Sequence, residues 1–171
     1  YLTAAIGQGE QYAAVPARNE AGDDDYLFAQ GSASGLSKIP FHDPRPAFAR
    51  LAHLPNVSVF VEQMTAFGEL VATAPPTPEQ SKDLDLLLSL GQLFTQVVYG
   101  QLICESAALA IDGEQGGKRE TSVSDASDLT EAHIDRVFAV FVKDFSEYAL
   151  SLSSQSAATE SQRDQALGLI K

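Results

Sequence analysis

The feature that most constrains the fold is a long apolar segment that begins after Thr77 and Pro78 and continues to about Ile111. Thr77 as a cap, Pro78 at the first helical position and Gln80 reaching back toward Thr77 predict the start of a helix. Such a helix has about 34 residues and a length of roughly 51 Å. Because it is apolar on nearly every side, we expect it to be the buried central helix of a bundle. The flanking helices would cover only part of it, so we expect the rest to meet another part of the polypeptide or a second subunit. The alternative is that the N-terminal 44 residues fold over the exposed side.

The few polar side chains of this segment change sides along its length. Gln92 and Gln96 lie on one side of the predicted helix, whereas Gln101 and Glu105 lie on the opposite side. The change occurs near Gly100, so the two halves of the helix are expected to contact different neighbours. The same four polar residues interrupt the apolar run, and we therefore do not predict a membrane span.

Two amphipathic helices flank the central one, over residues 56–74 and 129–153. Asn56 is the predicted cap of the first helix, while Asp128 and Glu131 form a predicted capping box for the second. Pro55 is expected to end a short helix at 46–54, whose inward residues are Phe48, Leu51 and Leu54. The predicted buried faces of the two longer helices are Val57, Phe60, Val61, Met64, Phe67 and Val71, and Ile134, Val137, Phe138, Phe141, Val142, Phe145, Ala149 and Leu152.

The remaining segments complete an all-α prediction. Residues 1–44 are expected to form an irregular N-terminal segment or linker, and residues 45–171 a helical bundle domain with a mobile loop at 112–127. Thr159 and Gln162 predict one more short helix, with Leu167 and Ile170 turned inward. Period-two alternation, the pattern of a half-buried strand, is not convincing anywhere in the chain.

The charge of the chain narrows the classes of partner. The formal net charge is −12, and a polyanion repels phosphates, so neither nucleic acid nor a membrane surface is an expected partner. No basic region followed by an apolar stretch predicts a signal peptide. The chain begins with Tyr1, which favours a cleaved product or part of a larger polypeptide, with further leading residues as the alternative.

Cys104 is the single cysteine, so no intramolecular disulfide is possible. This favours a reducing compartment, and we expect a cytoplasmic location. Cys104 lies in an apolar helical run without a basic neighbour that would lower the pKa of its thiol. We therefore interpret Cys104 as a small core residue rather than a nucleophile.

No arrangement of histidines or cysteines predicts a metal site. His42, His53 and His133 have neither the spacing of a zinc motif nor the Glu-x-x-His pairs of a di-iron bundle. The acidic run Asp23–Asp25 is expected to be a solvated loop or a helix start. The fragment Gly7–Gly9 is followed by loop-like sequence, and Ser32–Gly35 lacks the strand that precedes a nucleophile elbow.

Glutamates are the only acids that offer a candidate for catalysis, and we assign none of them that role. Glu62 and Glu69 lie on the polar face of an amphipathic helix, where carboxylates are usually solvated. Glu105 lies in an apolar stretch, and we expect a structural role in which a donor on another helix binds it or it reaches solvent at the bundle edge. Catalytic residues are therefore predicted to be none in this chain, and cofactor-binding residues remain unknown.

Five segments of the chain carry a resemblance to a known family. They are Asp83–Glu105, Ile134–Phe138, Val142–Ala149, Gly35–Phe41 and Leu54–Val57. Together they resemble the C-terminal region of a group of actinobacterial acyl-CoA dehydrogenases, in which an additional helical segment follows the flavin-binding body. The likeness extends from about Gly35 to Lys171. It lies in extended helices and not in a catalytic motif.

The resemblance implies an FAD-dependent oxidoreductase of fatty acid metabolism that oxidises an acyl-CoA thioester at Cα–Cβ. In the family a carboxylate removes the α proton and flavin accepts the β hydride. No segment here matches the family's catalytic-glutamate motif, so FAD and acyl-CoA are expected to bind mainly to the rest of the dehydrogenase. This segment would then serve packing and homo-oligomerisation. The alternative is a non-catalytic helical module that binds other proteins.

Overall fold

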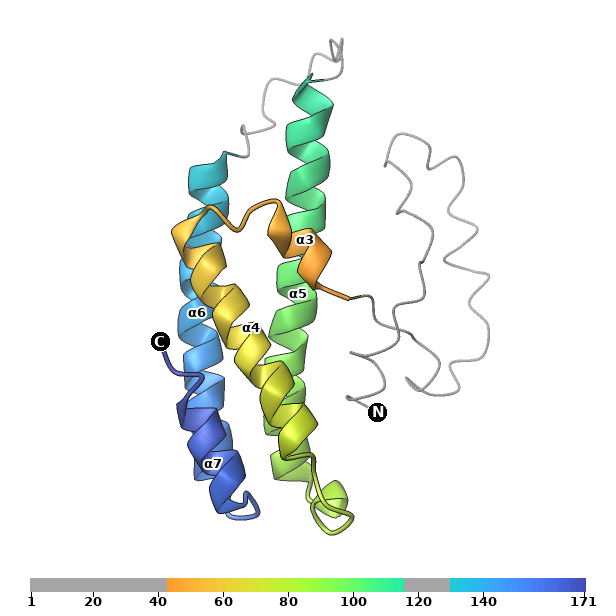
Figure 1. The fold of residues 1–171 in the computed structure, drawn as a ribbon, viewed down its shortest axis with the longest axis vertical. Helices are drawn as coiled ribbons and strands as arrows, with labels where there is room; N and C mark the ends of the chain where they lie inside the picture. Colours follow the sequence, from red (N-terminus) through yellow and green to blue (C-terminus); the bar gives the residue numbers. More distant parts are fainter. Residues whose placement is uncertain (1–42, 116–129) are drawn as a thin grey trace, which may run out of the picture. The chain divides into compact units, whose positions relative to one another are not determined.

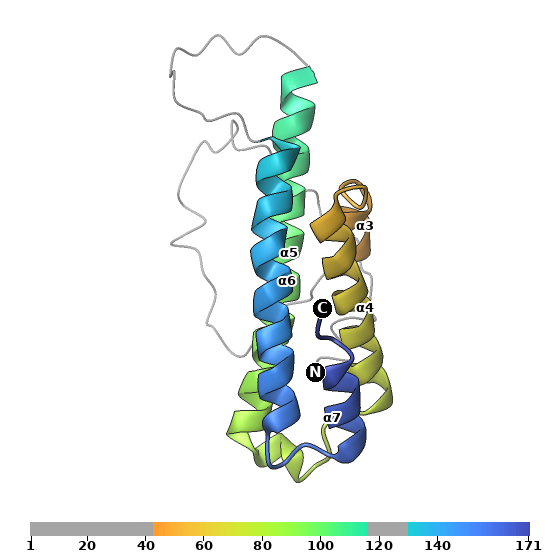
Figure 2. The ribbon, with the colours of Figure 1, turned by 90° about the vertical axis from the view of Figure 1, so that its left-hand side faces the viewer.

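The computed structural model describes residues 43–115 and 130–171, which form an all-α bundle (Figures 1 and 2). This confirms the predicted fold class and the long helix within it. The described elements are α3 (Arg45–Ala49), α4 (Pro55–Thr73), the 3₁₀ helix η3 (Gln80–Lys82), α5 (Leu84–Gln115), α6 (Glu131–Ser154) and α7 (Glu160–Leu167). No described residue is in a strand.

Helix α6 is the element that joins the others. It packs against α4, α5 and α7, while α3 packs against α5 and α4. Figures 1 and 2 show α5 and α6 running side by side in opposite directions. Helix α7 returns along α4 and α6, and η3 lies against the start of α5. The long helix therefore has packed neighbours on only part of its circumference.

The helix predicted at 46–54 is shorter in the structure, where α3 ends at Ala49, but the predicted segment still places three apolar side chains in the core. Phe48, Leu51 and Leu54 are all buried, as the sequence predicts. The prediction for Asn56 is wrong, because α4 begins at Pro55 and its N-cap residue is Leu54. Proline lacks an amide hydrogen and pushes the preceding residue into an extended conformation, which suits the first helical position and the cap before it.

The start of the long helix also differs from the prediction. Thr77 and Gln80 form the predicted reciprocal hydrogen bonds, at 2.9 and 3.2 Å, but these precede only η3. Asp83 then adopts an extended conformation, and its Oδ1 accepts a 2.9 Å hydrogen bond from the Leu86 amide. Helix α5 starts at Leu84 and continues to Gln115, so 112–115, predicted as loop, are helical.

The predicted capping box of α6 is also wrong in its residues. The N-cap residue is Thr130, and its partner is His133 rather than an acid. Glu131 is instead the first residue of the helix, and Asp128 lies outside the described residues. Thr159 and Gln162 do form the capping box predicted for α7.

The core contains a cluster of phenylalanine rings centred on Phe60 of α4. Phe138 and Phe145 of α6 lie edge-on to it, with ring centroids at 5.4 and 5.6 Å, and Phe48 of α3 lies at 5.7 Å. Edge-to-face rings at these distances are attractive in addition to the area they bury. The cluster therefore fixes α3, α4 and α6 around one point.

Some predicted core residues do not lie in the core. Val137 flanks the buried face of α6 and is 40% exposed, and Val61 is only half-buried. Leu167 and Ile170 are also exposed, whereas Ala166 and Leu169 are fully buried. The buried positions near α7 are Gln162, Ala166 and Leu169, which follow helical spacing, so the next residue along the chain turns toward solvent in each case.

Candidate functional site

Glu105 does not have the surroundings of a catalytic acid or base. It is half-buried, and its Oε1 accepts a 2.8 Å hydrogen bond from Nε2 of Gln101, one turn earlier on α5. The predicted donor on another helix is therefore replaced by a donor on the same helix. A pair at this spacing stabilises a helix by a few tenths of a kcal/mol.

Cys104 is a buried core residue, as predicted. Burial and, secondarily, the negative charge of Glu105 raise the pKa of its thiol to about 12. The thiolate is the nucleophilic form of cysteine. At neutral pH Cys104 is therefore a neutral, inert side chain.

The other candidate residues make surface contacts that explain them structurally. Glu62 forms an ion pair with Lys171 at 3.1 Å, and Glu69 is exposed. His53 contacts Glu131 at 3.1 Å, while His133 belongs to the cap of α6. Within 43–115 and 130–171, no three His, Cys, Asp or Glu side chains are grouped to hold a metal ion.

Several residues that the sequence offered as candidates for a site lie outside the described residues. They are His42, Gly7–Gly9, Asp23–Asp25 and Ser32–Gly35. The segment Gly35–Phe41, which carries part of the family resemblance, lies there as well.

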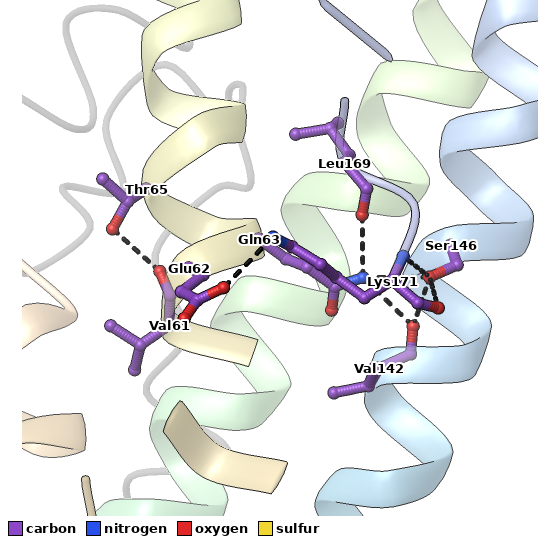
Figure 3. A network of polar contacts seen from close by, with 8 residues as sticks. All are labelled: Val61, Glu62, Gln63, Thr65, Val142, Ser146, Leu169 and Lys171. Atoms are coloured by element: carbon purple, nitrogen blue, oxygen red, sulfur yellow. Dashed lines mark hydrogen bonds and ion pairs between the residues drawn. The ribbon is translucent and has the colours of Figure 1, made fainter. Parts of the chain in front are cut away.

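A buried glutamine on α4 holds the C-terminal end of the chain (Figure 3). Nε2 of Gln63 lies within hydrogen-bond distance of the carbonyl oxygens of Leu169 (2.9 Å) and Val142 (3.2 Å) and of Oγ of Ser146 (3.0 Å). The Ser146 hydroxyl donates to Val142 and accepts from the amide of Lys171. Oε1 of Gln63 has no partner among the described residues.

A pair of buried glutamines joins α7 to the segment before α5. The side chains of Gln80 and Gln162 bond each other at 2.8 Å, and each also donates to a backbone carbonyl, Gln80 to Ala157 and Gln162 to Ala74. Both residues are buried and both belong to capping boxes. The pair therefore holds α7 against the segment that precedes α5.

The sequence predictions identified Gln80 and Gln162 only as caps and did not single out Gln63. A signal was present for Gln63, because it lies three residues after Phe60 and four before Phe67, both on the buried face of α4. A polar residue at such a position needs a hydrogen-bond partner on a neighbouring element.

The N-terminus of α4 is bound from another helix. Asp135 of α6 accepts hydrogen bonds from the backbone amide of Asn56 at 2.8 Å and from its Nδ2 at 2.7 Å. The carboxylate therefore satisfies a free amide at the positive end of the α4 dipole. This explains how α4 can begin at Pro55 without a side-chain cap of its own.

The N-termini of the longer described helices each carry a side-chain contact. A dinucleotide diphosphate is usually bound by free helix N-terminal amides or by cations. A side chain binds one amide of the first turn in each of the longer described helices: Asp135 at α4, Asp83 at α5, Thr130 at α6 and Thr159 at α7.

One face of α5, which we call the α5 stripe, carries apolar side chains that the described bundle leaves uncovered. It carries four large side chains that the bundle leaves uncovered: Leu84 is 73% exposed, Leu88 65%, Tyr99 55% and Leu102 49%. Gly91 and Thr95 lie between them on the same face, within an arc of about 80°. The α5 stripe consists of Leu84, Leu88, Gly91, Thr95, Tyr99 and Leu102, and it carries no charge.

Comparison of the chain with protein-family models, with curated protein sequences and with solved structures found no match.

Within the described part of the chain, the segment Leu84–Ala108 of α5 is long and apolar enough to cross a membrane by length and composition. The core helix of a water-soluble bundle satisfies the same criterion. Here α5 packs against α3, α6 and η3, and it carries the bonded pair Gln101–Glu105. Its packed side is therefore accounted for by the bundle, and the stripe is the part that needs a partner.

Proposed function

We propose that this bundle is a non-catalytic packing and oligomerisation segment, and that the enzyme to which it belongs is an FAD-dependent acyl-CoA dehydrogenase. The observation that carries the first half is the α5 stripe, an uncharged face with large apolar side chains at half to three-quarters exposure. The largest apolar patch on a soluble monomer is often functional, and patches larger than a few hundred Å² mark interaction sites.

The interior of the bundle also supports a structural role. Its buried polar side chains bind backbone or one another, as Gln63 binds Leu169 and Gln80 binds Gln162. Its one cysteine has a raised thiol pKa, and Glu105 is bound by Gln101. These contacts hold the helices of the described bundle together, which supports a structural role.

The dehydrogenase half of the proposal rests on the likeness of Asp83–Glu105, Ile134–Phe138 and Val142–Ala149 to that family. It assigns the flavin and the acyl-CoA to another part of the polypeptide or to another subunit. It also implies a cytoplasmic, homo-oligomeric enzyme.

A flavin assay on the protein isolated from its native source tests this half. We expect a yellow preparation whose flavin absorbance is bleached by acyl-CoA. A colourless preparation that binds only protein would instead support the second candidate, a free-standing interaction module. The α5 stripe favours that candidate equally, because an exposed apolar face is expected of both.

A further inference from the structure

We infer that the α5 stripe binds the same stripe of a second copy of this chain, with the two α5 helices antiparallel. This inference deepens the oligomerisation part of the proposed function and rests on it. It does not depend on the dehydrogenase half.

The register follows from a near-palindromic order of side-chain sizes about Leu93. Leu84 and Leu102 are equally far from Leu93 in the sequence, and so are Gly91 and Thr95. Leu88 and Tyr99 depart from this symmetry by a single position. In a twofold pair each residue meets the position that mirrors its own.

In an antiparallel pair, large side chains would therefore meet at both ends of the stripe and small ones at its centre. Leu84 would contact Leu102 of the second copy, and Leu88 would contact Tyr99. Gly91 would face Thr95 near the symmetry axis, where the two backbones approach most closely. Such a contact is closed and does not extend into a fibre.

Gly91 lies near the centre of the stripe and leaves room for a close neighbour. A Cβ added at Gly91 would have no atom within 4 Å, so the bundle itself does not require glycine there. Glycine inside a helix is less favourable than alanine by about 1 kcal/mol. A second helix lying over this position would explain the glycine, since small residues allow close helix approach.

The uncharged surface of the stripe suits contact with a second copy of this acidic chain, and the small area of the stripe indicates a weak contact. The chain carries a net charge of −12, yet the stripe is uncharged, so the contact itself places no like charges together. The exposed parts of Leu84, Leu88, Tyr99 and Leu102 amount to a few hundred Å², whereas a stable interface buries about 800 Å² per partner. The stripe and its half-buried flanks therefore predict a micromolar dimer rather than a permanent one.

The register is tested by disulfide cross-linking between two single variants, Leu84→Cys and Leu102→Cys. Native Cys104 is buried with a raised thiol pKa, so it does not compete. In an antiparallel pair the two variants cross-link when mixed. Neither variant forms a disulfide-linked dimer when it is alone, because the two copies of the same position are about 27 Å apart along the antiparallel pair. Cross-linking of Leu84→Cys with itself would show a parallel pair and overturn the register.

The assignment of the α5 stripe as the contact face is tested by substituting two glycines separately. Gly91→Leu should weaken self-association at least about tenfold without loss of helix content, because the bundle has room for the side chain. Gly68→Leu on α4 is the matched control, since Gly68 also has no atom within 4 Å of an added Cβ and lies off the stripe. Equal self-association of both variants would overturn the inference.

The outcomes also separate the inference from the function on which it rests. A stable oligomer that neither Gly91→Leu nor Leu88→Glu weakens would keep the oligomerisation function and reject the α5 stripe as its interface. A monomer under all conditions rejects both. Binding to lipid vesicles that Leu88→Glu abolishes, with no self-association, would assign the stripe to a membrane and reject the second copy.

Discussion

Gly100 of α5 lies against the ring of Phe60 of α4. A Cβ added at Gly100 would lie 2.9 Å from Cε1 of Phe60 and 3.1 Å from Cζ of Phe48. Both rings are fully buried in the aromatic cluster and have little freedom to move. The glycine therefore allows the long helix to approach α3 and α4 at the centre of the core.

This contact predicts opposite effects of the same substitution at two glycines of α5. Gly100→Ala should lower the free energy of unfolding by about 1–2 kcal/mol, because overpacking outweighs the gain in helix propensity. Gly91→Ala, which meets open space, should raise it by up to about 1 kcal/mol. Urea denaturation of dilute protein, followed by circular dichroism, measures both. Changes of the same sign would contradict the packing described at Gly100.

The glutamine that holds the C-terminal end predicts a large effect of a buried polar substitution. Gln63→Ala should lower the free energy of unfolding by about 2–4 kcal/mol, because it leaves a cavity and buried carbonyls without donors. Hydrogen exchange should rise at the Leu169 and Lys171 amides. Glu62→Gln is the control on the same helix, since it removes only an exposed ion pair and should cost about 0.5 kcal/mol or less. Similar losses in both variants would reject the role given to Gln63.

The cap supplied from α6 predicts a graded series at Asp135. Asp135→Ala should cost about 1–2 kcal/mol, because the Asn56 amide loses its acceptor and the α4 dipole loses a negative charge. Asp135→Asn keeps an acceptor and should cost about half as much. Asn56→Ala removes only the side-chain hydrogen bond and should cost less than Asp135→Ala. Thermal denaturation of the three variants measures the order, and a neutral Asp135→Ala variant would contradict it.

The raised pKa of Cys104 predicts a loss of stability in alkaline solution. The thiol pKa is about 12 in the folded chain and 9.0 when unperturbed. Between these values the folded state retains a proton that the unfolded state has lost, so stability falls as pH rises from about 9 toward 12. Below about pH 9 the full contribution is present.

Cys104→Ala should therefore show a shallower decline in the free energy of unfolding over that pH window, although its cavity makes it less stable at neutral pH. Urea denaturation at a series of pH values measures the slopes. The wild-type thiol should also react with an alkylating reagent at neutral pH only after unfolding. Rapid alkylation of the folded protein would show that Cys104 is neither buried nor protonated.

The sequence predicted the helices better than it predicted their ends. Helical spacing of Phe60, Phe67, Phe138 and Phe145 was sufficient to assign the buried faces of α4 and α6, because burial sets that period. The caps depended on tertiary contacts or on competing local signals. Asp135, distant in sequence, binds the start of α4, and Asp83 begins α5 after Thr77 and Gln80 close a separate 3₁₀ turn.

The candidate site was predictable only in outline. An excess of apolar residues in the long helix indicated a face that the other helices do not cover, but not which face it is. That depends on where α3 and α6 pack, which places Gly100 inward and Leu88 outward. The inward turn expected of Leu167 failed for a similar reason, since the buried Gln162 fixes the orientation of α7.

Sedimentation velocity of the 171-residue chain over a range of micromolar concentrations tests the central claim most directly. If the α5 stripe is an interface between copies, the average mass should rise from 18.2 kDa toward twice that value as concentration increases, with half-association in the micromolar range. A mass that stays at 18.2 kDa up to hundreds of micromolar would contradict it.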